Sequence, residues 1–207
     1  MSKVDPSSLL PHGSLSANTV HLCLDMQNLF ADETIWHTPW MRSVLPVVER
    51  LARHRPDRTI FTRFIPPEQP EDAKGTWRRY YQHNENVTRS KISPRSLELV
   101  ESLANLVPPA TVIDKAVYSP FSEHQLSELL RARRVDTVII SGAETDVCVL
   151  ATVLDAVDKG YRVLVAKDAL CSSTDETHDA LMSLYRNRFS QQIELVETSA
   201  VLQVWNV

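Results

Sequence analysis

The chain has 207 residues, of which 43% are hydrophobic and 23% charged, with a formal net charge of −4. This size and composition are typical of one globular domain with one core. The acidic balance and the lack of any long run of Lys or Arg argue against a nucleic-acid partner, and no apolar stretch approaches the roughly 20 residues that cross a bilayer.

The chain has three cysteines, Cys23, Cys148 and Cys171, an odd number without the paired spacing of a metal site. A disulfide framework is therefore not expected, and a reducing cytoplasmic location is the natural interpretation. The N-terminus lacks the basic start and apolar run of a signal peptide. Residues 1–18 are rich in Ser and Pro without periodicity. We expect them to form a flexible arm, or an arm that packs on a partner subunit, ahead of a single domain over residues 19–207.

In chain order, short β-branched and aliphatic runs alternate with stretches of helical spacing. Buried strands are expected over residues 19–24, 58–62, 111–113, 137–140 and 162–166, with a weaker one over 193–196. Helices are expected over residues 44–53, 94–106, 121–133, 146–159 and 175–188, the second with Ser93 as N-cap and Pro94 at its first position. This alternation predicts an α/β fold in which helices cover both faces of a parallel sheet.

The segment 64–91 breaks the alternation. It has no clean period, and it carries Trp77, Tyr80 and Tyr81 together with several arginines. A loop of this length inside a compact domain is usually functional. Two interpretations remain open, a lid that contributes to specificity and an interface with another subunit.

Polar side chains follow the predicted strands at the point where each strand ends. Asp25 follows the first, Arg63 the second and Lys115 the third, while the fourth runs into a predicted helix that contains Cys148. In parallel α/β sheets, ligands bind beyond the carboxyl ends of the strands. The sequence therefore predicts that an acid, an amine and a thiol converge at one edge of the sheet.

Each of these residues has a catalytic and a structural interpretation. Cys148 at a helix start would have a lowered pKa and could act as a nucleophile, or it could be a small buried apolar residue. Asp25 could take the thiol proton or cap the next helix, and Lys115 could stabilise the charge or lie on the surface. His178 could activate the thiol, although a histidine at a helix start is more often structural. The common position of Asp25, Lys115 and Cys148 favours the catalytic interpretation for these three.

Four segments resemble motifs of the isochorismatase-like cysteine hydrolases, in the order of that family. They are LDMQNLF at 24–30, DKAVYSPF at 114–121, GAETDVCV at 142–149, and residues 168–178. The resemblance implies a Rossmann-like three-layer fold with six strands in the order 3-2-1-4-5-6, and an Asp25–Lys115–Cys148 triad. It also implies a cis peptide between Ala143 and Glu144, so that the Glu144 and Cys148 N–H groups form an oxyanion hole. A homo-oligomer, dimer or tetramer, is expected on the same basis.

The chain departs from this family in one place. Nicotinamidase-type members carry an Asp-x-His metal motif after the second strand, where this chain reads RFIP at 63–66. A zinc-type site needs several carboxylate or imidazole ligands. We therefore expect neither a catalytic metal nor another cofactor, and nicotinamidase activity is disfavoured.

The complete triad favours a cysteine hydrolase that cleaves the C–N bond of a small amide, ureido or imide through a thioester. The alternatives are an isochorismate-type vinyl-ether hydrolase with Asp25 as general acid, and a non-catalytic member of the fold. Substrate contacts are expected from Trp77, Tyr118 and Phe121. Arg63 could pair with a substrate carboxylate or form a structural salt bridge.

Overall fold

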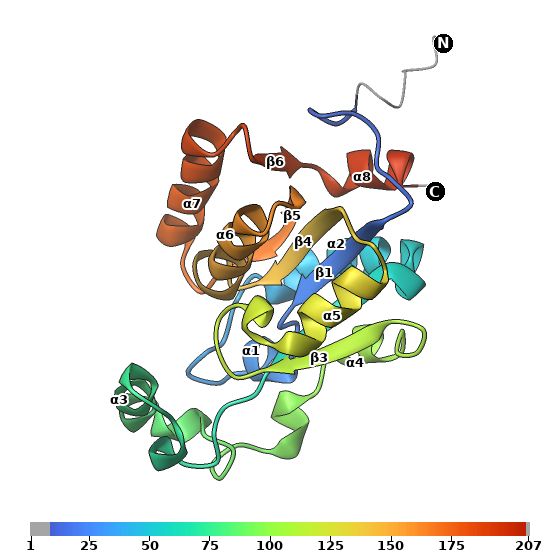
Figure 1. Cartoon of the computed structure of the whole chain (residues 1–207). Helices are drawn as coiled ribbons and strands as arrows, with labels where there is room; N and C mark the ends of the chain where they lie inside the picture. The colour runs from blue at the N-terminus through green and yellow to red at the C-terminus, as the bar shows by residue number, and fades with distance from the viewer. Residues whose placement is uncertain (1–8, 206–207) are drawn as a thin grey trace.

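The computed structural model describes residues 9–205 and contains a six-stranded parallel sheet (Figure 1). The strand order is β3-β2-β1-β4-β5-β6, which confirms the predicted topology. The strands are β1 (Thr19–Leu24), β2 (Thr59–Phe64), β3 (Thr111–Lys115), β4 (Thr137–Ala143), β5 (Arg162–Cys171) and β6 (Ile193–Val196). The first and last match the predicted bounds, and the other four extend further at their carboxyl ends.

The register aligns the carboxyl ends of the central strands. Leu24 at the end of β1 pairs with Gly142 on β4. Phe64 at the end of β2 pairs with Lys115 at the end of β3. Asp25, which follows Leu24, and Lys115 at the end of β3 are therefore brought to one edge of the sheet.

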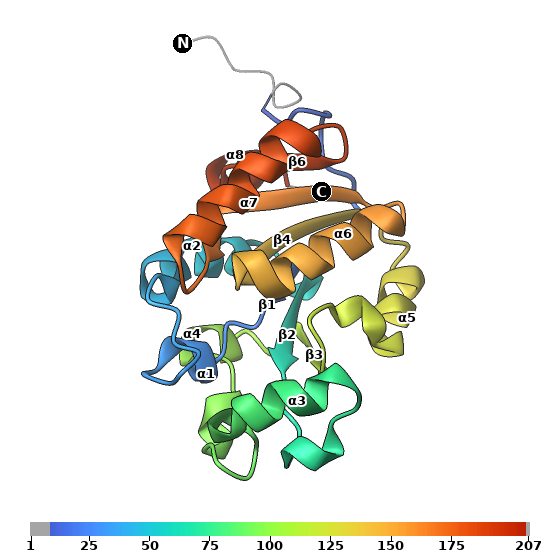
Figure 2. The ribbon, with the colours of Figure 1, turned by 90° about the vertical axis from the view of Figure 1, so that its left-hand side faces the viewer.

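Helices cover the sheet on both faces (Figure 2). One core layer packs against α2 (Met41–His54) and α8 (Thr198–Val204). The other packs against α5 (His124–Ala132), α6 (Leu150–Asp158) and α7 (Asp175–Arg188). Alternate residues of each strand enter opposite layers, as the period of a strand requires. The expected three-layer arrangement is thus confirmed.

The helix expected over residues 94–106 is wrong as one continuous element. The chain forms a 3₁₀ turn at Pro94–Leu97 and a single helical turn, α4, at Glu101–Ala104. Between them Leu99 forms an isolated bridge with Gln27, and the Val100 N–H donates to the Met26 carbonyl over 3.0 Å. Ser93 does cap the first turn, since its hydroxyl accepts from the Arg95 N–H. Pairing with a distant segment, which includes α1 (Asn28–Ala31), overrides the local helical pattern.

The segment 64–91 contains a helix, α3 (Thr76–His83), between 3₁₀ turns at Pro70–Asp72 and Glu85–Val87. Figure 1 shows α3 away from the sheet, beyond the carboxyl ends of the strands. Its aromatic side chains pack on one another, with ring centroids 5.4 Å apart for Trp77 and Tyr80 and 6.0 Å apart for Trp77 and Tyr81. This segment therefore stands over the edge at which the polar residues meet.

The described part of the N-terminal segment, residues 9–18, differs from the mobile arm expected there. Leu10 and Leu15 are buried in the core of the same chain. The Arg162 guanidinium donates to the Ser14 carbonyl over 2.7 Å and to the Gly13 carbonyl over 2.9 Å. The remaining residues of the expected arm, 1–8, lie outside the described residues. Within residues 9–205, every helix is too short or too polar to span a membrane.

Candidate active site

Asp25 occupies the turn immediately after β1 and is fully buried. Its φ of 51° is in the left-handed region, which residues other than glycine adopt uncommonly and which often marks a functional site. The Thr62 hydroxyl on β2 donates to Asp25 Oδ1 over 2.6 Å, and the Asp25 N–H donates to the Thr62 carbonyl over 3.2 Å. These bonds fix the carboxylate and direct its other oxygen, Oδ2, to Lys115.

Lys115 joins the acid to the thiol. Its Nζ lies 2.7 Å from Asp25 Oδ2 and donates to Cys148 Sγ over 3.3 Å. A third donation reaches the Val117 carbonyl over 3.2 Å, and the ammonium lies 4.8 Å from the centroid of the Phe64 ring. Burial opposes the charge of Lys115, but the Asp25 carboxylate and Cys148 outweigh burial and raise its pKa. The ammonium is therefore the fixed positive centre of the site.

Cys148 lies in a π-helical turn, Thr145–Val149, that connects β4 to α6. Such turns occur frequently at functional sites. The side chain is 6% exposed, whereas Cys23 and Cys171 are completely buried. Cys148 is therefore the one cysteine of the three that a small molecule can reach from solvent.

The lowered thiol pKa expected for Cys148 is wrong for this arrangement. Burial raises the pKa of Cys148, the Asp25 charge raises it further, and Lys115 lowers it without offsetting the other two. The resting group is accordingly a protonated thiol that is hydrogen-bonded to the Asp25 carboxylate. A thiolate forms here only when its proton moves to a base.

The peptide bond between Ala143 and Glu144 is cis, as the family resemblance implies. It connects the end of β4 to the π-helical turn. The Glu144 carbonyl accepts from the N–H groups of Val147 and Val149 over 3.1 and 3.0 Å. These bonds close the turn that carries Cys148.

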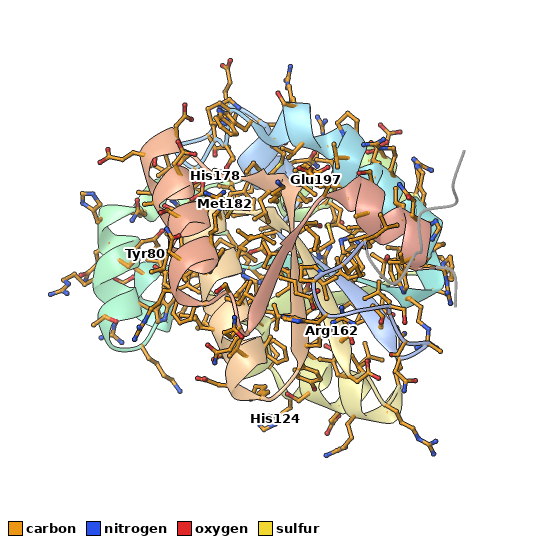
Figure 3. The ribbon with its side chains drawn as sticks, turned by 90° about the horizontal axis from the view of Figure 1, so that it is seen from above. Tyr80, His124, Arg162, His178, Met182 and Glu197 are labelled. Atoms are coloured by element: carbon orange, nitrogen blue, oxygen red, sulfur yellow. The ribbon has the colours of Figure 1, made fainter. Side chains whose placement is uncertain are left out.

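A small hollow of about 70 Å³ opens above the thiol. Its wall is largely aromatic, and the residues that line it are Phe30, Trp36, Phe64, Tyr80, Tyr118, Glu144, Val147 and Cys148. Tyr80 and Tyr118 also line a wider outer groove of about 830 Å³, of which α3 forms one side. Tyr80 lies on the side of α3 that faces the rest of the molecule (Figure 3). The hollow and the groove are therefore neighbours that share these two tyrosines.

The substrate contacts expected from sequence fall in different places. Tyr118 lines the hollow, and Trp77 packs on it at 4.7 Å while lining the outer groove. Arg63 forms a bidentate pair with Asp114 (2.7 and 2.9 Å) and a further bond to Glu98 (2.9 Å), so the geometry is that of a structural salt bridge.

Phe121 requires a correction. Its ring is buried in the core layer on the α5 and α6 face and stacks on Tyr161 at 5.8 Å. It is absent from the lining of the hollow. The 3₁₀ turn at Pro120–Ser122 directs the side chains of Tyr118 and Phe121 to different places.

His178 supports the turn that carries Cys148. It lies in the first turn of α7 (Figure 3). Its Nδ1 lies 2.9 Å from the Thr145 hydroxyl, and its ring centroid lies 5.5 Å from that of Trp40. These contacts agree with the structural interpretation of this histidine.

Several residues of the hollow were not predicted as substrate contacts from the sequence, namely Phe30, Trp36, Phe64 and the side chain of Glu144. Phe30 and Phe64 lie within the segments LDMQNLF at 24–30 and RFIP at 63–66, whereas Trp36 lies in a loop that carries no pattern of its own.

The position of the metal motif in nicotinamidase-type members is filled by an aromatic side chain here. The Phe64 ring lies 4.8 Å from the Lys115 ammonium, and the stretch RFIP at 63–66 contains neither a carboxylate nor an imidazole. Among residues 9–205, no three His, Cys, Asp or Glu side chains lie close enough together to share a metal ion. A ring and an ammonium do not supply metal ligands, so the residues present do not fit such a metal.

Comparisons with known proteins agree with this geometry. The family model for the isochorismatase domain matches residues 19–197. Nicotinamidase 3 of Arabidopsis thaliana is 30% identical over 166 residues, 79% of this chain and 78% of that protein. A probable inactive nicotinamidase of the same plant is 29% identical over 79% of this chain and 85% of its own length. An alignment with a Bacillus subtilis isochorismatase family protein spans only 47% of that protein.

Among solved structures, a cysteine hydrolase from Pseudomonas syringae pv. phaseolicola superposes with a TM-score of 0.79 at 24% identity. The superposition covers 98% of this chain and 97% of that one. This likeness extends over the whole sheet and its helices.

Proposed function

Because the chain belongs to the isochorismatase family, whose members here include hydrolases, we propose that it is a cysteine hydrolase that cleaves the C–N bond of a small amide, ureido or imide. The observation that carries the proposal is the buried Asp25–Lys115–Cys148 cluster at the base of the hollow. The Lys115 ammonium lies 2.7 Å from the carboxylate and 3.3 Å from the thiol. Burial of such charged groups costs desolvation free energy, and buried clusters of this kind are typical of functional sites.

The first half of the reaction forms a thioester. Asp25 takes the proton of the Cys148 thiol to which it is hydrogen-bonded, and the new thiolate stays paired with the Lys115 ammonium. The sulfur attacks the substrate carbonyl carbon. The backbone N–H groups of Glu144 and Cys148 stabilise the oxyanion of the tetrahedral intermediate.

The second half releases both products. Asp25 returns its proton to the leaving nitrogen as the C–N bond breaks, which leaves an acyl group on Cys148. Asp25 then takes a proton from water, the resulting hydroxide attacks the thioester, and the carboxylic acid leaves as the thiol is restored. The substrate supplies the acyl group and the amine, and water is the only other reactant.

The vinyl-ether hydrolase remains the rival reaction. It uses Asp25 as a general acid and needs no thiol. The experiment that separates the two measures kcat/KM for Cys148→Ala, Asp25→Asn and the double variant on a panel of small amides and on isochorismate. The control is Cys23→Ala, which also removes a buried thiol but lies in the core.

We expect Cys148→Ala to lose on the order of 10³-fold or more of the amide activity, and the double variant to be only a few-fold worse, because residues that act as a unit lose activity non-additively. The Cys23→Ala control should keep most of its activity. Near-normal turnover by well-folded Cys148→Ala, checked by circular dichroism, would falsify the thiolate mechanism. If isochorismate is turned over by that variant, the rival holds.

A further inference from the structure

The lining of the hollow above Cys148 combines aromatic rings with one carboxyl group and no basic side chain. Five of its eight lining residues are aromatic, namely Phe30, Trp36, Phe64, Tyr80 and Tyr118. Glu144 supplies its only carboxyl group, and neither Lys nor Arg is among the eight. The ammonium of Lys115 is engaged below by Asp25 and Cys148. An anionic substrate group would therefore meet a carboxyl group without a cation to pair with it.

The carboxyl group of Glu144 is held in place by hydrogen bonds from two hydroxyl groups. The Thr38 hydroxyl, itself fully buried, donates to Glu144 Oε1 over 3.0 Å. Ser173 also hydrogen-bonds to this carboxyl group. A carboxyl group with two hydroxyl donors has a fixed direction, and it retains acceptor capacity for a donor on a bound molecule.

Aromatic walls and one fixed carboxyl group together favour a particular chemistry. Aromatic faces attract cations and the positive edges of N–H groups. A carboxyl oxygen accepts hydrogen bonds from amines and ammonium groups, whereas a buried carboxylate beside it would be repelled and unpaired. Arg79 is a cation in the lining of the outer groove, and it does not line the hollow.

We propose that the side chain of Glu144 determines specificity, by selecting compact amides that carry an amine, ammonium or N–H donor beside the scissile carbonyl and by rejecting amides that carry a carboxylate there. The proposal rests on the proposed function, since it assumes that the carbonyl sits over Cys148. It assigns the Glu144 carboxyl group a role separate from that of its backbone N–H.

The test measures binding in a chain that cannot turn over, Cys148→Ala. Three small amides that differ in the group on the carbon beside the carbonyl are titrated at pH 7 and followed by NMR: glycinamide as the cation, propionamide as the neutral amide and malonamate as the anion. The same titrations are run with Glu144→Gln added, which keeps the backbone N–H and the shape. The matched control is Glu128→Gln, which removes one negative charge from the exposed face of α5.

We expect glycinamide to bind about tenfold more tightly than malonamate, the effect of one hydrogen bond to a charged group. Glu144→Gln should bring the two within about threefold of each other, while Glu128→Gln should leave the ratio unchanged. Equal binding of malonamate, or a preference that survives Glu144→Gln, overturns the proposal. If Glu144→Gln fails to fold, Thr38→Val replaces it, because this variant removes the hydroxyl that holds the Glu144 carboxyl group. A ratio of glycinamide to malonamate affinity that Thr38→Val leaves unchanged likewise counts against the proposal.

The outcome is independent of the catalytic mechanism. Charge-selective binding by a chain whose wild type hydrolyses no amide would support the role of Glu144 and reject the proposed reaction. Amide turnover by the wild type, without any charge preference in binding, would support the proposed reaction and reject the role of Glu144.

Discussion

Lys115 shares one ammonium between two groups that compete for it, the Asp25 carboxylate at 2.7 Å and the Cys148 sulfur at 3.3 Å. While Asp25 is ionised, the cluster already holds one negative and one positive charge in a buried place, and a second negative charge on sulfur is disfavoured. Moving the proton from sulfur to Asp25 keeps the total charge constant. The thiolate therefore arises by proton transfer inside the cluster.

This arrangement predicts an unusual effect of Asp25→Asn. The substitution removes the charge that raises the pKa of Cys148 and leaves Lys115, which lowers it. The thiol pKa should fall while amide turnover also falls, because the base and acid are gone. The midpoint of the pH profile for iodoacetamide alkylation, with peptide mapping to Cys148, reports the thiol pKa.

The control for this prediction is Asp114→Asn, which neutralises a carboxylate paired with Arg63 outside the cluster and should leave the midpoint in place. Cys148 should be alkylated before Cys23 and Cys171 in the wild type, since only it is exposed at all. An alkylation midpoint that rises in Asp25→Asn would contradict the assigned electrostatics.

At the scale of elements, the close approach of β4 to β1 positions the turn that carries Cys148. Gly142 has a φ of 109°, and a Cβ on it would lie 2.1 Å from the Leu24 carbonyl oxygen. A side chain there would force β1 and β4 apart beside Asp25. The requirement for glycine is thus both conformational and steric.

Gly142→Ala should destabilise the fold by about 3 kcal/mol or more, since it adds a backbone clash to an unfavourable φ. Gly160→Ala is the matched control, because Gly160 has a φ of 82° but nothing within 4 Å of its added Cβ. It should cost about 1 kcal/mol. Urea unfolding of the two variants measures the difference, and similar losses would show that the clash relaxes.

The end of β2 carries a prediction about metals. Phe64 packs against Lys115 at 4.8 Å, and a ring cannot be a ligand. Activity on the amide found by the panel should therefore survive dialysis against EDTA within experimental error. Loss of turnover that zinc or iron restores would show that a metal binds through residues other than those at 63–66.

The elements that could be predicted from the sequence are those with local signals. β1 and α7 match their expected bounds because each carries a clear pattern and ends at a clear boundary. The convergence of Asp25, Lys115 and Cys148 followed from the rule for parallel strand ends. By contrast, the helix expected over 94–106 fails because Leu99 pairs with Gln27, 72 positions earlier in the chain, and such pairing leaves no local trace.

The pKa of Cys148 shows the same limit at the candidate site. Its place near a helix start was visible in the sequence, but the burial and the Asp25 contact that raise its pKa depend on the assembled sheet. Trp36 and the Glu144 carboxyl group reach the hollow through loop geometry, which the residue pattern does not encode.

At the scale of the whole molecule, the sheet buries titratable groups that ionise freely in an unfolded chain. Burial raises the pKa of Cys23 from 9.0 to about 12, and burial also raises the pKa of Cys171 and Cys148. His21 shows the converse, since burial lowers its pKa to about 3 and it stays neutral between Ser141 and Thr59. The folded state therefore keeps uncharged groups where the unfolded state would charge them.

The cysteines lead to a prediction for alkaline stability. A group whose pKa is raised by folding contributes stability that is complete below its unfolded pKa and is lost as the pH rises toward its folded pKa. Above about pH 9 the unfolded chain releases thiol protons that the folded chain retains, so the free energy of unfolding falls with pH. Each buried cysteine should contribute a slope of about 1 kcal/mol per pH unit.

Urea unfolding between pH 7 and 11 under reducing conditions measures this slope. Cys23→Ala should reduce the slope by the share of one cysteine, even though the substitution also lowers the free energy of unfolding at pH 7. A free energy of unfolding that stays flat or increases from pH 9 to 11 would mean that the thiols ionise inside the folded protein. Burial would then not raise their pKa values, and this would contradict the protonated resting state assigned to Cys148.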